Sequence, residues 1–115
     1  MDRVVRAFPL LSGKRQAFHA FTQEMSRRTA DVSQFYRSYG IVRESWHLQE
    51  TTAGDLVVCC TDIGDAKTAA PTYAAAQGQF EAWFKGQVLE LCGIDANRQP
   101  LGPDTRMVFD WPGPS

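Results

Sequence analysis

Apolar residues recur at helical intervals over Gln79–Asp95, which makes this stretch the clearest single element of the sequence. The positions that share one stripe of the expected helix are Phe80, Trp83, Phe84, Val88 and Leu91. Spacings of three and four residues place side chains on one face of an α-helix. Gly93 predicts the helix end, because glycine readily adopts the left-handed conformation found there, and Ile94 is then placed to pack against the last turn. An aromatic stripe of this size requires a large apolar surface to cover it.

A second helical period runs through Lys14–Tyr39. The apolar positions that keep one phase on a helical wheel are Ala17, Phe18, Phe21, Met25, Val32, Phe35, Tyr36 and Tyr39. An unbroken helix of this length would measure about 39 Å, whereas a strand of eight residues spans about 27 Å. We therefore expect a break near Thr29–Asp31, and Gly40 is expected to end the segment.

Short runs of β-branched, apolar and alternating residues predict strands beside these helices. The four runs are Arg3–Leu11, Ile41–Thr51, Asp55–Asp62 and Thr105–Trp111. One face of the second run carries Val42, Glu44, Trp46 and Leu48. Its other face carries Arg43, Ser45, His47 and Gln49. The third run is apolar on both faces, which predicts either a position in the middle of the sheet or cover on both sides.

The order strand, helix, strand, strand, helix, strand predicts a single ferredoxin-like α+β domain over residues 1–115. Its βαββαβ arrangement gives a four-stranded antiparallel sheet with both helices on one face. The opposite face would carry no helix. With Val57, Cys59 or their neighbours on that face, the chain would require a partner to cover it.

The whole-chain pattern resembles the dimeric α+β barrel superfamily, which includes antibiotic-biosynthesis-monooxygenase-like proteins, stress-responsive barrel proteins and many uncharacterised members. The segments that carry the resemblance are RVVRAFPLL (3–11), the strand Arg43–Glu50, DLVVCCTD (55–62) and the helix around FEAWFKGQVLEL (80–91). The resemblance implies a homodimer in which two sheets pack face to face and enclose a small cavity. Some relatives bind haem through a histidine on the second helix. Gln79–Cys92 has none, so no cofactor is expected unless His47 ligates a haem instead.

Composition narrows the class of protein and its partners. Hydrophobic residues make up 43% of the chain and charged residues 22%, as in an ordinary soluble globular protein. A net charge of −1, from 12 basic and 13 acidic side chains, argues against a dedicated nucleic-acid binder. The first 15 residues have charges on both sides of a very short apolar run, which fits neither a signal peptide nor a membrane span.

The cysteines and histidines indicate the cellular compartment and whether a metal site is expected. Three cysteines without a C-x-x-C pair indicate reduced thiols in a cytoplasmic protein. The two histidines lie on different elements, and their spacing does not predict a structural zinc site. No metal is therefore expected, although a site built from Asp and Glu of different elements stays open.

The polar face of the second strand is the candidate site. If the helices cover the face that bears Trp46, the row of Arg43, Ser45, His47 and Gln49 points into the barrel interior, where polar groups would orient a small ligand. In that arrangement His47 is the candidate acid or base, because an unperturbed histidine titrates near pH 6.5. Arg6 on the first strand and Arg106 on the last would join the row, depending on register. The alternative is that the row is a solvated face or a dimer contact.

Three functions follow from this site. The leading hypothesis is a cytoplasmic homodimer that binds a small organic molecule in the barrel interior, with no catalysis indicated. The resemblance implies, as an alternative, a cofactor-independent monooxygenase-like or isomerase-like enzyme, with His47 as acid or base and Arg43 or Arg6 holding an anion. A structural or regulatory interaction module with a filled interior is the third. A register slip of one residue would send His47 to the helix side.

Overall fold

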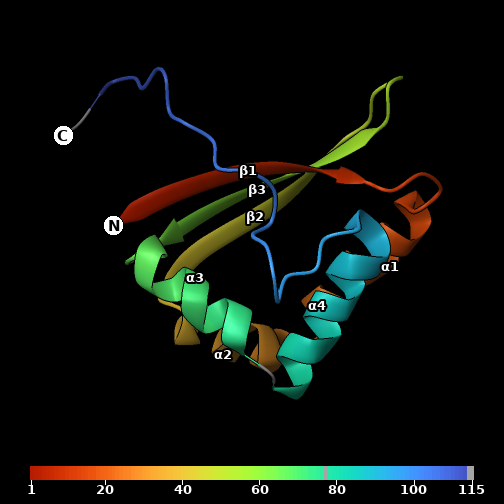
Figure 1. The fold of residues 1–115 in the computed structure, drawn as a ribbon, viewed down its shortest axis with the longest axis horizontal. Helices are drawn as coiled ribbons and strands as arrows, with labels where there is room; N and C mark the ends of the chain where they lie inside the picture. Colours follow the sequence, from red (N-terminus) through yellow and green to blue (C-terminus); the bar gives the residue numbers. More distant parts are fainter. Residues whose placement is uncertain (77, 114–115) are drawn as a thin grey trace.

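The computed structural model describes residues 1–76 and 78–113, and it is an α+β fold in which helices cover an antiparallel sheet (Figure 1). The elements are β1 (Asp2–Leu10), α1 (Arg15–Arg27), α2 (Thr29–Ser38), β2 (Ile41–Gln49), β3 (Asp55–Ile63), α3 (Ala66–Ala75) and α4 (Gln79–Cys92). Among the described helices, none combines the length and the apolar character needed to cross a membrane.

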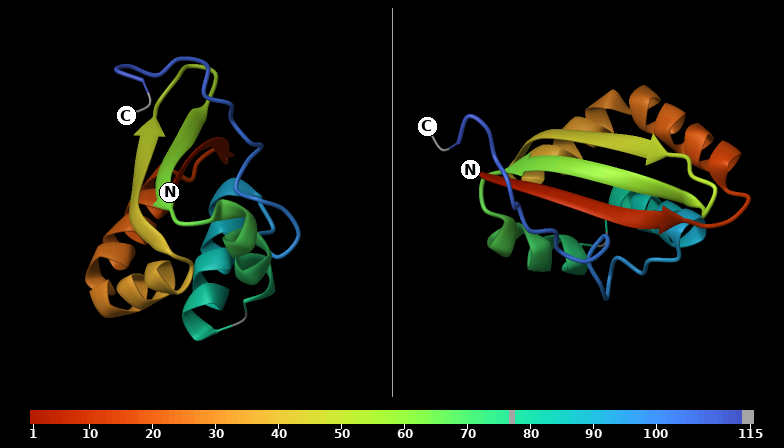
Figure 2. Two further views of the ribbon diagram at one scale, coloured as in Figure 1. Left: turned by 90° about the vertical axis from the view of Figure 1, so that its left-hand side faces the viewer. Right: turned by 90° about the horizontal axis from the view of Figure 1, so that it is seen from above.

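The helices of the described residues lie on one side of the sheet (Figure 2). The predicted segment Lys14–Tyr39 is divided into α1 and α2 at Arg28, where the backbone leaves the helical conformation at φ −91° and ψ 51°. The break lies next to the expected range, Thr29–Asp31. The predicted segment Gln79–Asp95 holds α4, and the alanine-rich α3, which contains Pro71, precedes it.

The sheet has three antiparallel strands in the order β1-β3-β2, with β3 in the middle as its two apolar faces predicted. Cys59 pairs with Arg6 on one side and with Trp46 on the other. Directly paired residues share a face. The register therefore places these three residues on the same side, and that side faces the helices, because Trp46 packs against the core.

The fourth strand that was predicted at Thr105–Trp111 is not part of the sheet, and that prediction is wrong for a single chain. The sheet ends at β1 on this side, and residues 105–111, the C-terminal arm, form no regular element and are exposed. The Thr105 hydroxyl donates a hydrogen bond to the Val5 carbonyl. Beyond it the chain leaves β1 and runs away from the helices (Figures 1 and 2). A strand requires a neighbouring backbone for its N–H and C=O groups, and no ladder supplies one here.

The predicted stripe of α4 forms the centre of the core. Its most buried members are Phe84, Val88 and Leu91, each 1–2% exposed. Gly93 ends the helix as predicted, at a left-handed φ of 71°, and its N–H donates to the carbonyl of Leu89 at 2.9 Å. Ile94 is buried next to it.

Trp46 connects the sheet to the helices. Its ring centre lies 5.8–6.3 Å from those of Phe8, Phe18, Phe21 and Phe84. Aromatic pairs at this distance contribute about 0.5–1.5 kcal/mol each beyond the area they bury. Because successive side chains of a strand alternate between faces, the position of Trp46 directs Glu44 towards the helices as well.

Candidate ligand-binding site

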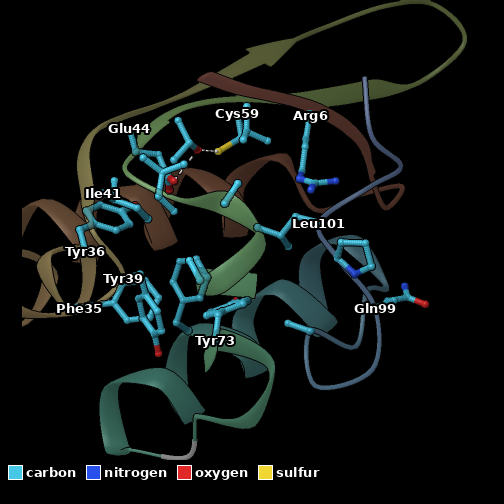
Figure 3. A pocket seen from close by; sticks show the side chains of 18 of the residues that line it. Arg6, Phe35, Tyr36, Tyr39, Ile41, Glu44, Cys59, Tyr73, Gln99 and Leu101 are labelled. Carbon is cyan, nitrogen blue, oxygen red and sulfur yellow. Dashed lines mark hydrogen bonds between the residues drawn. The ribbon is translucent and has the colours of Figure 1, made fainter. Parts of the chain in front are cut away.

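A cavity of about 460 Å³ lies between the helix side of the sheet, helices α2 and α3, and the loop 95–104 that leads towards the C-terminus (Figure 3). Most of its lining side chains are aromatic or apolar, and a few polar groups are placed among them. Small-molecule sites in proteins have this composition and a volume of about 300–1,000 Å³. The cavity is therefore the candidate site of the single chain.

Glu44 supplies the fixed acceptor of this cavity. One carboxylate oxygen accepts a hydrogen bond from the Trp46 indole N–H at 2.7 Å, and the other accepts from the Thr61 hydroxyl at 2.7 Å. Thr61 is the cross-strand partner of Glu44, so the register of β2 and β3 brings the two together. An ionised carboxylate has about four acceptor positions. The positions that Trp46 and Thr61 leave open can accept from other donors, and the Tyr36 hydroxyl interacts with this carboxylate.

Tyr36 on α2 contributes a hydroxyl donor beside that carboxylate. Burial, with the nearby negative charge of Glu44, raises the pKa of the Tyr36 hydroxyl far above its ordinary value. The phenol therefore stays protonated at neutral pH. The pair places a proton donor and a proton acceptor on the same cavity wall.

Tyr73 on α3 carries an unused hydroxyl. Its oxygen is buried and has no hydrogen-bond partner among the described residues. Burial raises the pKa of this hydroxyl as well, so it too stays protonated. An unsatisfied buried polar group costs about 1–3 kcal/mol, and a ligand acceptor placed against it would remove that cost.

Aromatic rings form the wall around the Tyr73 hydroxyl. The Phe35 ring lies 5.3 Å from that of Tyr39 and 6.0 Å from that of Tyr73, in edge-to-face contacts, and Tyr39 and Tyr73 are 5.7 Å apart. Figure 3 shows these three rings across the cavity from Glu44 and Cys59. Rings held by mutual contact offer a preformed apolar surface to a ligand.

Arg6 lies where the C-terminal loop meets the sheet. Its guanidinium donates to the carbonyl of Gly102 at 3.0 Å and pairs with Asp104 at 2.8 Å. Gly102 has a φ of 76°, and a side-chain carbon at that position would lie 2.7 Å from the carbonyl oxygen of Ala7. Only glycine allows this approach. The loop is thus held against β1 and forms one wall of the cavity.

Lys85 fastens the same loop to the helices. This side chain of α4 is buried, and its ammonium donates to the carbonyl of Ala76 at 2.7 Å and to the side-chain oxygen of Asn97 at 3.0 Å. It also lies 4.9 Å from the centre of the Tyr73 ring. Burial lowers the pKa of Lys85. One cation therefore joins α4, the end of α3 and the loop 95–104 behind the cavity.

Cys59 is an inert thiol in this setting. Its sulfur lies 3.7 Å from the Thr61 hydroxyl, and burial raises its pKa far above the ordinary value. Burial likewise raises the pKa of Cys92 to about 11. The thiolate is the nucleophilic form of cysteine, so neither side chain is activated. Cys59, Cys60 and Cys92 are all free thiols.

The predicted polar row of β2 lies on the other side of the sheet. Because Glu44 and Trp46 face the helices, the alternate positions face the helix-free side; they are Arg43, Ser45, His47 and Gln49. Ser45 Oγ and His47 Nε2 are 3.0 Å apart. These are the residues that were predicted for a barrel interior, and such an interior would require a second sheet. Their role in a site stays a prediction.

The two arginines that were predicted for the site lie in different places. Arg6 lines the 460 Å³ cavity, because its pairing with Cys59 turns it to the helix side. Arg106 lies in the exposed segment after Thr105. Of the predicted site residues, only Arg6 is among those that line this cavity.

Sequence analysis missed Glu44, Tyr36 and Tyr73 as functional groups. Glu44 carried a readable signal, because a carboxylate that alternates with Trp46 and Leu48 interrupts an apolar face and needs buried partners. Tyr36 was assigned to the apolar stripe of its helix. Tyr73 lies in an alanine-rich stretch without helical periodicity, which gave no indication of its direction.

A second cavity, of about 500 Å³, is lined in part by Trp46, whose indole N–H donates to Glu44 of the first cavity. Its wall includes His19, which is exposed, and two charged side chains. Those charges are Arg15 and Glu50, whose atoms approach to 3.5 Å, while Arg15 also pairs with Asp55 at 2.9 Å. The polar groups of this cavity largely satisfy one another. Within residues 1–76 and 78–113, no group of three or more His, Cys, Asp and Glu side chains is gathered to hold a metal ion.

The fold is shared with a solved enzyme structure. No family model and no curated protein matches the sequence. The crystal structure of L-rhamnose mutarotase from Formosa agariphila superimposes with a TM-score of 0.63 at 11% sequence identity, over 96% of this chain and 98% of that one. At this identity the likeness shows the fold alone.

Proposed function

We propose that this protein binds a small neutral molecule that carries hydroxyl groups, in the cavity between the sheet, α2 and α3. The observation that carries the proposal is that one aromatic-walled cavity is lined by the anchored Glu44 and by Tyr73, whose buried hydroxyl has no partner among the described residues. The carboxylate would accept from a ligand hydroxyl, and the phenol would donate to a ligand oxygen. The aromatic rings would contact the apolar face of the ligand.

A neutral ligand suits the charges around this cavity. Arg6 pairs with Asp104, and Arg98 pairs with Asp95 at 3.4 Å. The arginines that line the cavity thus each have a carboxylate, whereas an anionic ligand would require a cation of its own and would meet Glu44. The fold neighbour, whose name states that it acts on a sugar, makes neutral sugars the first class to test.

The test is saturation-transfer difference NMR of the full chain with L-rhamnose and a panel of other neutral monosaccharides. Glu44→Gln should weaken binding about ten- to hundredfold, because a hydrogen bond to a charged group is worth about 1.5–3 kcal/mol. Glu90→Gln is the matched control, since Glu90 is an exposed carboxylate paired with Lys14. The absence of binding across the panel, or equal binding by the Glu44→Gln variant, would refute the proposal.

An isomerase that interconverts sugar anomers is a second candidate. The adjacent Glu44 carboxylate and protonated Tyr36 favour it, since ring opening needs one group that removes the anomeric hydroxyl proton and another that protonates the ring oxygen as the carbon–oxygen bond breaks. Exchange NMR would measure the rate between anomers of a sugar that binds. A rate enhancement that disappears in Glu44→Gln and Tyr36→Phe would support catalysis, and binding without enhancement would leave a binding protein.

The proposal includes a homodimer in the cytoplasm. The helix-free side of the sheet has no covering element, and its polar row would lie between the sheets if a second copy packed against it. The barrel interior that was predicted from the sequence would then exist, with His47 and Arg43 inside it. His47→Ala should leave sugar binding unchanged if the site is the helix-side cavity, and should reduce it if the site is the barrel interior.

A further inference from the structure

Among the described residues, five aromatic side chains line the 460 Å³ cavity, and Phe35 touches the other four. Its ring centre is 5.1–6.0 Å from those of Tyr36, Tyr39, Tyr73 and Phe84. The rings of Phe35, Tyr39 and Tyr73 meet one another at interplanar angles of 69–87°. Three rings at nearly right angles form a corner, which surrounds a small group with aromatic surface on more than one side.

The Glu44 carboxylate is the charge that the cavity leaves uncompensated. Its two oxygens accept hydrogen bonds from neutral donors, Trp46 and Thr61, which is the pattern of an ionised carboxylate. Within the part of the chain that the structure describes, no basic side chain forms an ion pair with Glu44. The arginines that line the cavity each pair with an aspartate. The cavity therefore carries one net negative charge.

The negative charge of Glu44 also reaches the aromatic wall. Burial is the main cause that raises the pKa of the Tyr73 hydroxyl, and the charge of Glu44 is the next. The same two causes, in the same order, raise the pKa of Tyr36. Figure 3 shows Glu44 across the cavity from Phe35, Tyr39 and Tyr73. A positive group placed between them would face a carboxylate on one side and aromatic rings on the other.

The Tyr73 ring already has a cation over it. The ammonium nitrogen of Lys85 lies 4.9 Å from the centre of this ring, behind the cavity. Aromatic rings attract cations because the face of the ring carries negative charge. Burial lowers the pKa of Lys85, and the charges of Glu81 and Asp95 oppose that effect. These carboxylates offset the charge of Lys85, so it does not cancel that of Glu44.

We infer that the cavity also binds a quaternary ammonium ion, held between the Glu44 carboxylate and the aromatic corner of Phe35, Tyr39 and Tyr73. Rings attract such ions within about 6 Å of their centres, and more strongly where water is excluded. An ion without N–H groups suits this wall, because an unmethylated ammonium has three donors and aromatic rings offer few acceptors. The inference rests on the cavity of the proposed function and adds a charged class of ligand to it.

The cavity has the room and the entrance for such an ion. Its volume of about 460 Å³ lies within the range of small-molecule sites. Gln99 and Pro100 line the cavity and are exposed, so it opens to solvent beside the loop 95–104. Arg98, at the same entrance, pairs with Asp95 at 3.4 Å. An entering cation would therefore pass a paired arginine.

The test compares choline with 3,3-dimethyl-1-butanol, a neutral analogue of the same shape in which carbon replaces the charged nitrogen. NMR titration of the full chain measures both dissociation constants. Choline should bind about tenfold more tightly, because the attraction between a cation and aromatic rings at a site without water is worth about that factor. Equal binding of the two compounds would overturn the inference, since shape alone would then explain it.

Tyr39 offers a pair of variants that separates the ring from its hydroxyl. Tyr39→Leu removes the aromatic face and should reduce the preference for choline several-fold, whereas Tyr39→Phe, which keeps a ring, should retain it. Glu44→Gln should reduce the preference as well. The matched control is Glu90→Gln, because Glu90 is an exposed carboxylate paired with Lys14. Circular dichroism shows which variants are folded, and the Tyr39 pair decides if Glu44→Gln is not. A preference that Tyr39→Leu leaves unchanged would overturn the inference.

The outcomes separate this inference from the proposed function. Binding of neutral sugars without binding of choline would overturn the inference and leave the neutral ligand standing. Binding of choline without any sugar of the panel would support the inference and refute the neutral class. The absence of both would overturn both.

Discussion

The two sides of the sheet differ in how far a single chain completes them. On the helix side, Trp46 and Phe84 are covered by other rings, and Glu44 has a partner for each oxygen. On the helix-free side, His47 and Arg43 are exposed, and the C-terminal arm extends past the sheet with its aromatic residues uncovered. The first side has the properties of a ligand site in one chain. The second has the properties of a surface that is completed by another molecule.

The largest effect on the free energy of unfolding is expected when a core ring on the helix side is lost. Phe84→Ala should lower the free energy of unfolding by about 3–5 kcal/mol, because it leaves a cavity among packed aromatic residues. Val108→Ala in the arm should change it by no more than about 0.5 kcal/mol at concentrations where the chain is monomeric. Urea unfolding followed by tryptophan fluorescence measures both. Similar losses would show that the arm is part of the single-chain fold.

The next largest effect on stability is expected at Gly102, where the loop 95–104 is held against β1. Gly102→Ala is expected to cost about 2–3 kcal/mol, since it combines a left-handed backbone with a side-chain carbon 2.7 Å from a carbonyl oxygen. Gly13→Ala has a similar φ of 78° with no atom within 4 Å, so it should cost about 1 kcal/mol. Thermal unfolding compares the two variants. Equal losses would mean that the close approach to Ala7 is not strained.

A smaller effect, of opposite sign, is expected inside the cavity. Tyr73→Phe removes a buried hydroxyl without a partner, so it should raise the stability of the ligand-free protein by about 1 kcal/mol. The same change should weaken sugar binding several-fold. Tyr36→Phe removes the hydroxyl beside Glu44 and should not stabilise the protein. If Tyr73→Phe lowers stability, its hydroxyl has a partner and the proposed donor is lost.

The smallest effect concerns the charges of the helix-free side. The hydrogen bond from Arg3 to Asp62, at 2.8 Å, lowers the pKa of that carboxyl. A lowered folded-state pKa adds stability that is complete above the ordinary value of about 4 and is lost as the pH falls through the folded-state value. The urea midpoint should therefore decrease between pH 5 and pH 3. Asp62→Asn should make that decrease smaller, and an unchanged decrease would show that the pair is not responsible.

Periodicity was sufficient to predict most of the fold. The stripe from Phe80 to Leu91 predicted α4, and alternation around Trp46 predicted the two faces of β2 but left open which of them meets the helices. The break near Arg28 followed from a length argument, because one helix would have been longer than the sheet. These predictions depend on local geometry, which repeats along the chain.

The parts that the sequence did not predict depend on contacts between distant residues or between chains. The arm has a strand pattern, but whether it pairs depends on the edge it meets, and Gly102 fixes its base in a way that composition does not indicate. The cavity forms where β2, α2 and α3 meet, so Tyr73 had no local signal. His47 was favoured because histidine suits acid–base chemistry. Glu44 is the central polar group of the cavity because Trp46 and Thr61, which lie elsewhere on the two strands, donate hydrogen bonds to its carboxylate.

The contacts of the loop 95–104 also have a consequence for the entropy of binding. Lys85 holds Asn97 near the start of this loop, and Arg6 holds Gly102 and Asp104 near its end. A segment that is held at both ends has little conformational freedom left to lose when a ligand binds. The wall that it forms is therefore preformed, and a variant that releases either end should weaken binding through entropy even where no ligand contact is lost.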